Sequence, residues 1–397
     1  MTNPLPLAGI KIVDLSIALT GPYAAALLGD QGAEVIKVER PGFGDIGRYV
    51  GVSVNGLSAL AQMCNRGKRS LALDVHQPAG REILLQLASN ADVVVQNFRP
   101  GVVERLGVGY DDVRAVNDRV VYASLSGFGP TGPYAAKGAY DTVIQAYGGM
   151  AANQAGADGV PHFLNQTVAD KVTALYAAQA ITAALFARER TGAGTHVQLA
   201  MLDAVVSFLW ADAAGNEVLQ DANRSQPSSF VSNFRPFHFR DGWGICTPTS
   251  DADFAGMCQA FGVDGYDDPR VATIVERSQH RELAGEIMNR CYAAAAEMTT
   301  ADAIDALEAR NVPCGVVLTP TELAADPHAQ AIGLFEDSVH PTAGRLRQPR
   351  HPTDFGGTRP PIGGPAPMLG QHTDEILREL GVADERITEL RAAGIAG

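Results

Sequence analysis

Short apolar runs alternate with helical patterns through the first 130 residues of the chain. The runs that lack polar alternation predict buried strands at 10–15, 34–38, 70–73, 92–95 and 120–125. Helices are predicted at 22–28, where Pro22 suits a first helical position, and at 79–90. This alternation is typical of a parallel sheet covered on both faces, so the pattern predicts an α/β domain.

The pattern changes after residue 140, and helical character dominates 140–221. The most apolar segment, 173–187, is broken by Gln179 and is predicted to be a buried helix, because no apolar run reaches the roughly 18 residues of a membrane span. The polar, Pro-containing segment 223–237 is predicted to separate two domains. Residues 238–330 then have the pattern of a smaller mixed domain. Its helices are predicted near 252–261, 281–297 and 301–310.

Composition narrows the possible functions. Of the 397 residues, 46% are hydrophobic and 19% are charged, which is enough to bury a sizeable core. The net charge of −13 argues against general binding to nucleic acid or to an anionic membrane. The charge is unevenly distributed, however, because residues 1–140 have a net charge of +1 and the remaining residues a net charge of −14. An anionic ligand is therefore expected in the first third of the chain.

The cysteines are scattered and odd in number, which argues against a disulfide framework and against a zinc site. They are Cys64, Cys246, Cys258, Cys291 and Cys314. The segment MTNPLPLAG lacks the basic and apolar regions of a signal peptide. We therefore expect a cytoplasmic protein, with no bound metal.

A GxGxxG pattern at Gly127, Gly129 and Gly132 follows a predicted strand, as a dinucleotide-binding fingerprint does. Pro130 and Pro133 stand where the phosphate-binding helix would begin, and no strand that ends in an acidic residue follows about 20 residues later. The pattern is therefore interpreted as a Gly- and Pro-rich loop and not as a nicotinamide or flavin site.

Basic and polar residues gather around the predicted strands. They are Arg40, Arg66, Lys68, Arg69, Asn97, Phe98, Arg99, Arg105 and Lys137. Arg40, Asn97 and Arg99 follow strands, where parallel sheets bind ligands, whereas 66–69 precede a strand and could converge with them only through a long loop. Together they would suit a phosphorylated ligand, with Phe98 as an apolar face for a base. The alternative is that they are solvated surface charge.

Asp170 stands at the start of the Ala-rich helix, which has Arg188 and Arg190 near its end before Gly192. An acidic residue at a helix start is an ordinary capping feature. The same position would keep a carboxylate ionised and fixed, which suits a carboxylate nucleophile. Tyr140 and Asp141 begin a second helix with the same two possible roles.

Several segments in order resemble the class III CoA-transferase family, which includes formyl-CoA transferase, the carnitine CoA-transferases and the α-methylacyl-CoA racemases. They are LAGIKIVDLS (7–16), GPYAAALLGDQGAEVIKVERPGFGD (21–45), NRGKRSLALD (65–74), ADVVVQNFRPG (91–101), GAYDTVIQAYGG (138–149), VPCGVVLTPTELAADPH (312–328) and LGQHTDEILRELG (369–381). The resemblance covers nearly the whole chain.

The resemblance implies a fold. A large Rossmann-like CoA-binding domain would combine 1–222 with 331–397, and 223–330 would form a smaller inserted α+β domain. Two chains of this family interlock, so the resemblance implies an interlocked homodimer. The Gly- and Pro-rich stretch at 348–367, which we expect to wrap a surface in extended form before a helix at 374–380, is compatible with such interlocking.

The resemblance also implies roles for single residues. Asp170 matches the family's catalytic aspartate, which attacks an acyl-CoA thioester and carries CoA covalently to an acceptor acid. The family's CoA-binding positions match Arg40, Leu73, Asn97, Phe98 and Arg105 in this sequence. Lys137 lies one residue from a position where the family has a basic residue that binds CoA. Lys68 and Arg69 are included as CoA-binding candidates on charge alone. CoA is then a substrate, and no cofactor is expected to be tightly bound.

Two departures from formyl-CoA transferase predict a bulkier or less polar acyl group than formyl or oxalyl. Leu19 stands where that enzyme has a glutamine, and its glycine-rich loop is replaced by SQPSSFVSNFRPF at 225–237.

Two other functions remain open. The first is a 2-methylacyl-CoA racemase or epimerase that works by α-proton exchange. Its Gly-His-Asp motif is here Ala139, Tyr140 and Asp141, and an ordinary tyrosine is a poor base at neutral pH. This favours transfer over racemisation. The second is a non-catalytic CoA-binding protein, against which the presence of Asp170 argues.

Overall fold

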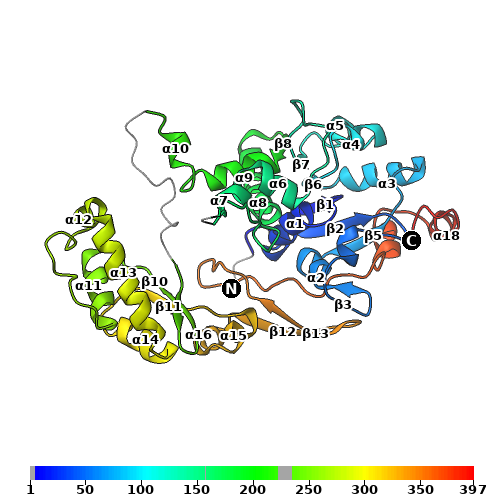
Figure 1. Ribbon diagram of the computed structural model, residues 1–397. Coiled ribbons are helices and arrows are strands. Elements are labelled where there is room, and N and C mark those ends of the chain that lie inside the picture. The colour runs from blue at the N-terminus through cyan, green and yellow to red at the C-terminus, as the bar shows by residue number, and fades with distance from the viewer. Residues whose placement is uncertain (1–4, 157, 222–234) are drawn as a thin grey trace. The chain divides into compact units, whose positions relative to one another are not determined.

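A six-stranded parallel sheet is the central element of the structure, a computed structural model that describes residues 5–156, 158–221 and 235–397 (Figure 1). The strands lie in the order β5-β2-β1-β6-β7-β8 and every neighbouring pair is parallel. They are β1 (Lys11–Asp14), β2 (Glu34–Glu39), β5 (Arg69–Ala72), β6 (Val93–Gln96), β7 (Val121–Ser126) and β8 (Thr195–Ala200). The first five confirm the predicted strands.

The prediction that helices dominate 140–221 is wrong at β8. This six-residue strand is mostly half-exposed, and it lies at the edge of the sheet with β7 as its neighbour. Its backbone pairs with β7, while Val197 and Leu199 alternate with polar residues and pack against the core of α1 and α8. The strand therefore lacks the continuous apolar run by which the buried strands were predicted.

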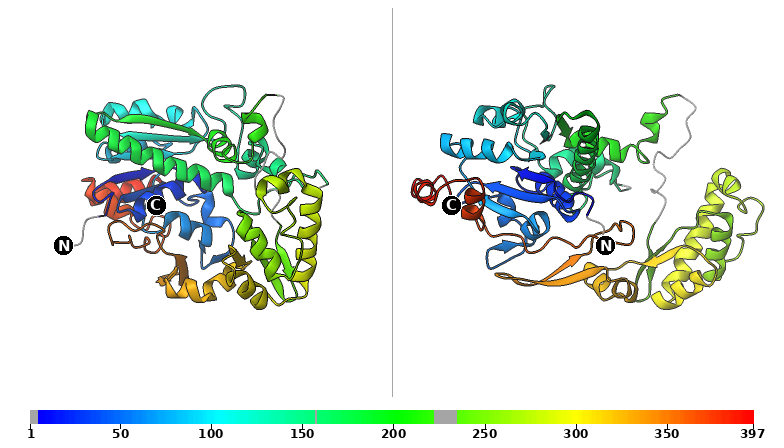
Figure 2. Two further views of the ribbon diagram at one scale, coloured as in Figure 1. Left: turned by 90° about the vertical axis from the view of Figure 1, so that its left-hand side faces the viewer. Right: turned by 180° about the vertical axis from the view of Figure 1, so that it is seen from behind.

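Helices cover both faces of the sheet, which explains why residues on opposite sides of its inner strands are both buried. Successive strand residues such as Val93 and Val94 belong to different cores. One core packs against α1 (Thr20–Asp30) and α8 (Val168–Thr191), and Figures 1 and 2 show α8 as the long helix beside α1. The other core packs against α3 (Pro78–Ala88), α4 (Val102–Leu106), α5 (Tyr110–Val116), α17 (Thr373–Glu379) and α18 (Asp384–Ala392).

Small side chains let α1 and α8 approach each other closely. Ala24 and Ala25 on α1 share a buried core with Ala174 and Ala177 on α8. Alanine also favours the helical state, so the Ala-rich sequence accounts for the 24-residue length of α8. The helix ends at Gly192, whose φ of 77° is the left-handed conformation that glycine adopts readily. This helix fixes Asp170 in its first turn.

The final segment of the chain covers the β5 edge of the sheet. The backbone N–H of His372 donates to Ser70 O (3.0 Å) and that of Gly397 donates to Ala72 O (3.1 Å). Before it, the predicted extended stretch follows the hairpin of β12 (Phe335–His340) and β13 (Gly344–Pro349). The amide of Gly363 donates to Asp30 Oδ1 (3.0 Å), so this stretch does lie extended against the larger part of the chain.

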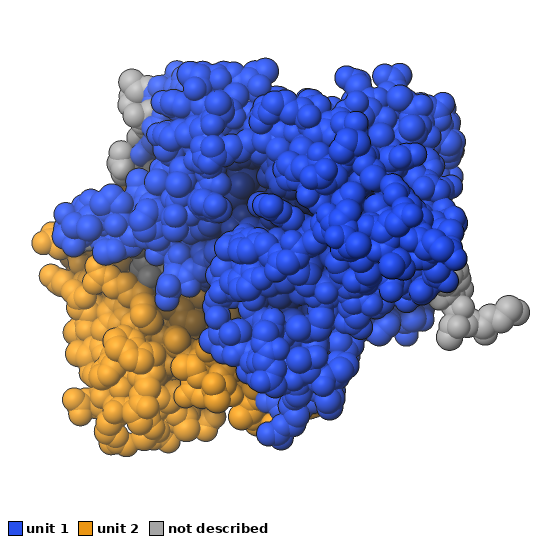
Figure 3. All heavy atoms as spheres, turned by 90° about the vertical axis from the view of Figure 1, so that its right-hand side faces the viewer, with its two compact units in different colours: residues 1–224, 333–397 blue, residues 225–332 orange. Residues whose placement is uncertain are grey.

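The chain divides into two compact units, Met1–Arg224 with Gly333–Gly397 and Ser225–Ile332, which Figure 3 distinguishes by colour. The second unit has an antiparallel sheet of β11 (Cys314–Val316), β10 (Gly242–Cys246) and β9 (Phe237–Phe239). Its helices are α11 (Asp251–Ala260), α12 (Ile274–Gln279), α13 (Arg281–Ala296), α14 (Thr300–Glu308), α15 (Pro320–Ala325) and α16 (Pro327–Ala331). An aromatic and aliphatic core of its own joins sheet and helices.

The remaining elements belong to the first unit. They are the 3-10 helix η1 (Ile46–Tyr49), β3 (Ser53–Val54), β4 (Leu57–Ser58), α2 (Ala59–Asn65), α6 (Asp141–Tyr147), α7 (Met150–Asn153), α9 (Met201–Leu209) and α10 (Gly215–Val218). Among the described residues, no helix combines the length and the apolar character needed to cross a bilayer.

Gly21 permits the close contact between the β1–α1 loop and the start of α1, and this predicts the effect of two alanine substitutions. In Gly21→Ala the new Cβ would overlap Ser16, whereas in Gly29→Ala the nearest atom is Val35 Cγ2 at 3.3 Å. Both changes favour the helix by about 1 kcal/mol. We expect Gly21→Ala to lower the thermal unfolding midpoint, at a net cost of about 1–3 kcal/mol from overpacking, while Gly29→Ala does not. Equal midpoints by circular dichroism would refute this packing role.

Candidate active site

The loops that follow β1 and β6 diverge at the middle of the sheet. From β1 the chain passes through α1 to β2 on one side, and from β6 it passes to β7 on the other. In an open parallel sheet such a reversal leaves a crevice at the carboxyl ends of the strands, where ligands bind.

Two pockets open in this crevice. The first, here called the Leu73 pocket, has a volume of about 210 Å³ and is largely apolar, with Arg40 and His76 among its lining residues. The second, here called the Asp170 pocket, has a volume of about 300 Å³. Ile17, Phe98 and Val102 line both, so the pockets are adjacent compartments. The Asp170 pocket is lined by Ile17, Ala18, Thr20, Ile46, Asn97, Phe98, Arg99, Pro100, Val102, Leu125, Ser126, Gly127, Ala135, Lys137, Ala139, Tyr140, Asp170 and Met201.

Asp170 lies half-buried in the first turn of α8 and lines its pocket. Thr20 Oγ1 donates a hydrogen bond to Asp170 Oδ1. The backbone N–H of Asp170 donates to Asp141 Oδ2 (3.0 Å), so the first residue of α6 holds the first turn of α8. The Asp141 carboxylate is buried and also accepts a hydrogen bond from Gln145 Nε2. The position of Asp170 is therefore set by two other helices.

Burial raises the pKa of Asp170 to about 6. The Thr20 hydroxyl lowers this pKa and the neighbouring Asp141 carboxylate raises it further. The sequence predicted a carboxylate kept ionised by the helix terminus, but desolvation outweighs that effect here. With a pKa of about 6, the carboxylate is about nine-tenths ionised at pH 7 and is less stabilised by its surroundings than an exposed one. Such a carboxylate is a suitable nucleophile.

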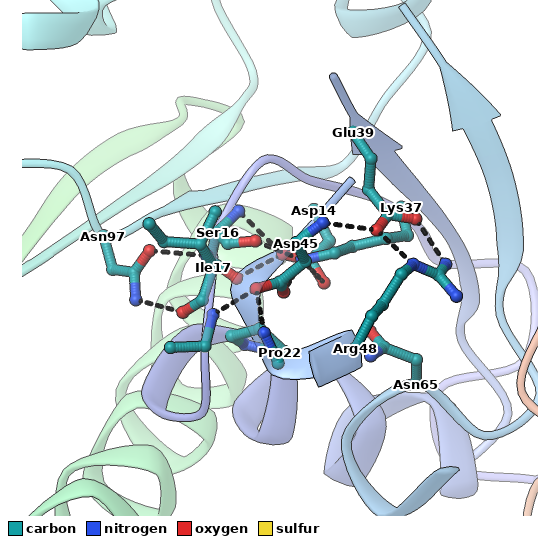
Figure 4. A network of polar contacts seen from close by, with 12 residues as sticks. Asp14, Ser16, Ile17, Pro22, Lys37, Glu39, Asp45, Arg48, Asn65 and Asn97 are labelled. Atoms are coloured by element: carbon teal, nitrogen blue, oxygen red, sulfur yellow. Dashed lines mark hydrogen bonds and ion pairs between the residues drawn. The ribbon is translucent and has the colours of Figure 1, made fainter. Parts of the chain in front are cut away.

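A buried network of charges fixes the loop between β1 and α1 (Figure 4). Asp45 Oδ1 accepts the N–H of Ala18 (2.7 Å), and Lys37 Nζ donates to Asp45 Oδ2 (3.0 Å) and to Ser16 O. Ala18 has a φ of 65°, an unfavourable conformation for a residue with a Cβ, which these contacts offset. On the pocket side, Asn97 Oδ1 accepts the N–H of Ile17 (2.7 Å) and Asn97 Nδ2 donates to Ile17 O (2.8 Å).

The buried carboxylates of this network are paired with buried ammonium groups. Asp14 is fully buried and accepts from Lys68 Nζ at 2.7 Å, with Lys37 Nζ at 3.9 Å. Burial alone would raise the pKa of Asp14, but the two ammonium groups hold it below its usual value. Burial likewise opposes the charge of Lys37, yet Asp14, Asp45 and Glu39 raise its pKa to about 12. The opposite charges of Asp14 and Lys37 therefore favour the ionised form of both groups inside the protein.

Comparison with known proteins identifies the family. The profile described as CoA-transferase family III matches residues 7–373. The chain belongs to this family. Human succinyl-CoA:glutarate CoA-transferase is 32% identical, over 100% of this chain and 91% of that protein. Formyl-CoA:oxalate CoA-transferase of Rhodopseudomonas palustris is also 32% identical, over 98% of this chain and 96% of that protein.

Solved structures agree with this family assignment. A CaiB/BaiF family protein from Brucella suis superimposes with a TM-score of 0.82 at 31% identity, over 95% of this chain and 100% of that one. The resemblance inferred from the sequence is thereby confirmed at the level of family and α/β fold.

The structure brings several of the predicted CoA-binding residues to the crevice. Arg40 and Leu73 line the Leu73 pocket, Asn97 lines the Asp170 pocket, and Phe98 lines both. Lys137 also lines the Asp170 pocket, where its ammonium group lies 4.3 Å from the centre of the Tyr147 ring and donates to the Tyr147 hydroxyl.

Arg105, Lys68 and Arg69 lie elsewhere. Arg105 is exposed on α4 and lines neither pocket. Lys68 is buried, where its ammonium group donates to Asp14 and to Pro22 O (2.8 Å). Arg69 forms ion pairs with carboxylates at 34, 375 and 379. The charges of Lys68 and Arg69 are thus used by ion pairs within the protein, and neither residue lines these two pockets, so their described contacts do not support the expectation that they bind CoA.

Other predictions about the site have different outcomes. Tyr140 lines the Asp170 pocket but is 76% exposed, as the residue before α6. Leu19 is buried and does not line either pocket, so the polarity of the pocket does not depend on it. The segment 225–237, which replaces a glycine-rich loop, lies outside the described residues as far as 234.

Two residues important to the site escaped the sequence analysis. Thr20 contacts Asp170 across 150 positions of the chain, and Asp45 reaches Ala18 across 27 positions. No local pattern reports such contacts. The one available signal was the position of Thr20 directly before Gly21 and Pro22, which places it where the loop after β1 meets the predicted helix.

The raised pKa of Asp170 predicts how its removal changes stability with pH. In the folded protein the pKa is about 6 and in the unfolded chain it is near the ordinary value of 3.8, so ionisation destabilises the fold. We expect Asp170→Asn to stabilise the protein by up to about 3 kcal/mol above pH 6, and to have no such effect below about pH 4, where the carboxyl is protonated in both states.

Urea unfolding at several pH values measures this difference. Asp384→Asn is the matched control, because Asp384 is an exposed first-turn residue of α18 whose ion pair with Arg378 is worth little. A stability gain for Asp170→Asn that did not depend on pH would contradict the assignment of the raised pKa.

Proposed function

We propose that this protein is a CoA-transferase that moves CoA from an acyl-CoA donor to a carboxylic acid acceptor, with Asp170 as the covalent nucleophile. The observation that carries the proposal is the half-buried Asp170 carboxylate, which opens into the same crevice as the residues expected to bind CoA. Membership of CoA-transferase family III and the names of the similar proteins support the reaction class.

The two pockets suggest how CoA is held. The apolar Leu73 pocket suits the adenine, with the Phe98 ring beside it. Arg40 lines this pocket, and neither Arg40 nor the exposed Arg105 on α4 makes an ion pair within the described parts of the chain. Unpaired guanidinium groups are available for phosphates, which they bind through charged hydrogen bonds. The acyl end of the ligand then passes Ile17, which lines both pockets, and enters the Asp170 pocket.

The reaction then proceeds by exchange of acyl partners on Asp170. The carboxylate attacks the thioester carbonyl of the donor and CoA leaves as a thiolate, which forms a mixed anhydride. The thiolate attacks Asp170 Cγ and releases the donor acid, which leaves an aspartyl-CoA thioester. The acceptor carboxylate repeats these steps in reverse. Apolar lining residues such as Leu125 and Met201 limit water at the site, where it would hydrolyse both intermediates.

The pocket favours an acyl group larger or less polar than formyl. Leu125, Ala139 and Met201 contribute apolar walls beside Asp170. Arg99 also lines this pocket, without an ion pair among the described residues, and can attract an acidic substrate. The similar proteins carry names for both succinyl-CoA:glutarate and formyl-CoA:oxalate transfer at the same identity, so similarity alone does not choose between these substrates.

The other functions fit less well. Racemisation needs a base beside the thioester, and the residue at that position is the largely exposed Tyr140. A non-catalytic CoA-binding role does not explain why a desolvated carboxylate, that of Asp170, lines the pocket. The homodimer expected from the family resemblance stays a prediction.

Covalent trapping tests the proposal directly. After incubation with succinyl-CoA or acetyl-CoA, hydroxylamine or borohydride is added and the peptide that contains Asp170 is examined by mass spectrometry. We expect a hydroxamate or a reduced side chain at Asp170 because both intermediates are activated acyl groups. Asp170→Asn should lose transfer by more than about 10⁴-fold and still bind CoA, since nucleophile removal has effects of this size.

Asp384→Asn serves again as the control and should trap as the unaltered protein does. An unmodified Asp170 in protein that binds CoA, together with solvent deuterium entering the α-carbon of the acyl group, would replace transfer by racemisation. CoA binding with neither label nor exchange would favour the non-catalytic alternative.

The different surroundings of two arginine side chains give a second test. We expect Arg40→Ala to raise the KM for acyl-CoA by about tenfold or more, because a phosphate contact is lost, and to change kcat little. Arg69→Ala removes an arginine of the same charge, which among the described residues pairs with three protein carboxylates, so the KM of this variant should stay near that of the unaltered protein. Steady-state kinetics over a range of acyl-CoA concentrations measure both. Equal KM changes in the two variants would contradict the proposed CoA position.

A further inference from the structure

Thr20 is the polar side chain in closest contact with Asp170. It is the first residue of α1 and only 3% exposed, yet it lines the Asp170 pocket. Its Oγ1 donates to Asp170 Oδ1, and within the described chain no other side chain donates to that carboxylate. Asp170 Oδ2 is therefore the oxygen without a side-chain donor. The two oxygens of the nucleophile are in different environments.

The position of the Thr20 hydroxyl is set before any substrate arrives. Two residues earlier, Ala18 is held by Asp45 Oδ1, and Ile17 is held on both sides of its backbone by Asn97. The residue after Thr20 is Gly21, which packs directly on Ser16. A donor that is held in this way costs no reorganisation when charge develops on its acceptor.

We propose that Thr20 is a catalytic residue whose hydroxyl stabilises the negative charge on Asp170 Oδ1 when a thiolate or a carboxylate attacks Asp170 Cγ. This inference rests on the proposed function, because it assigns a role within the covalent steps on Asp170. It adds a residue and a side-chain chemistry that the sequence analysis did not select.

Thr20 assists the attack of the CoA thiolate on the mixed anhydride. Asp170 Oδ2 has attacked the donor carbonyl, so it bridges Cγ and the acyl group in the mixed anhydride. The CoA thiolate forms a bond to Cγ, and the electron pair of the Cγ=Oδ1 double bond moves to Oδ1. When that pair returns, the Cγ–Oδ2 bond breaks and the donor acid leaves as a carboxylate with Oδ2. No proton is needed, and the Thr20 proton stays on Oγ1 throughout.

The charge on Oδ1 explains why this hydrogen bond favours the transition state. In the ionised carboxylate, Oδ1 carries about half a negative charge, and in the anhydride or thioester it is a neutral carbonyl oxygen. In the tetrahedral state it carries a full charge, so the same donor contributes most there. Loss of one such donor reduces kcat by about 10²–10³-fold in other enzymes of acyl transfer.

Two substitutions at Thr20 separate the hydroxyl from the rest of the side chain. Thr20→Val keeps the shape and removes the donor, whereas Thr20→Ser keeps the donor. Thr173→Val is the matched control, because Thr173 is a fully buried threonine on α8 whose hydroxyl donates to Ala169 O (2.7 Å) and not to Asp170. The measurements are kcat and KM with succinyl-CoA and an acceptor acid, and carbodiimide labelling of Asp170 as a function of pH, read by peptide mass spectrometry.

We expect Thr20→Val to lower kcat by about 10²–10³-fold with little change in the KM for acyl-CoA, and Thr20→Ser to stay within about tenfold of the unaltered protein. Labelling should report a higher pH midpoint for Asp170 in Thr20→Val, because the hydroxyl favours the ionised form. Thr173→Val should leave both readouts unchanged.

The proposal is overturned if Thr20→Val retains its kcat, or if Thr20→Ser loses as much activity as Thr20→Val. Failure of the proposed function has a different signature, which is an unaltered protein that is never acylated at Asp170. The labelling midpoint does not depend on turnover, so an unchanged midpoint in Thr20→Val would by itself refute the contact.

Discussion

The arrangement of the site depends on charges that are buried with their partners. Isolated ions are costly to desolvate, and removal of one member from a buried pair leaves the other uncompensated. Asp14, Lys37, Asp45 and Lys68 each have an oppositely charged neighbour inside the first unit. Asp45 and Lys37 also form hydrogen bonds with the backbone of the β1–α1 loop. A change to either charged residue would therefore also alter the conformation of this loop.

The β1–α1 loop lies between these buried charges and the nucleophile Asp170. It ends in Thr20, which contacts Asp170, while α6 holds the backbone of the same aspartate through Asp141. Burial makes the Asp170 carboxylate less stable as an anion, and the hydroxyl limits this effect enough to keep it ionised near neutral pH. Two opposed influences of the surroundings thus give a group that is both charged and reactive.

Much of the fold followed from periodicity, whereas the site followed only in part. Apolar runs located five strands because each is buried on both faces, but β8 at the edge escaped this test. Residue type and position after a strand pointed to Arg40, Asn97 and Phe98, which line the crevice. Lys68 has the same charge as a ligand-binding residue, and only its burial against Asp14 distinguishes it. Local sequence reports the type of a side chain and not its distant partner.

The split of the first unit along the chain has a consequence for folding during synthesis. Residues 225–332 are continuous and can fold once they leave the ribosome, since domains generally fold as units. All six strands of the central sheet have been made by residue 200, but the backbone groups at the β5 edge find their partners only when 372–397 have been made. Until then an unpaired strand edge stays open to other chains, and such an edge in a nascent chain is what chaperones protect from aggregation.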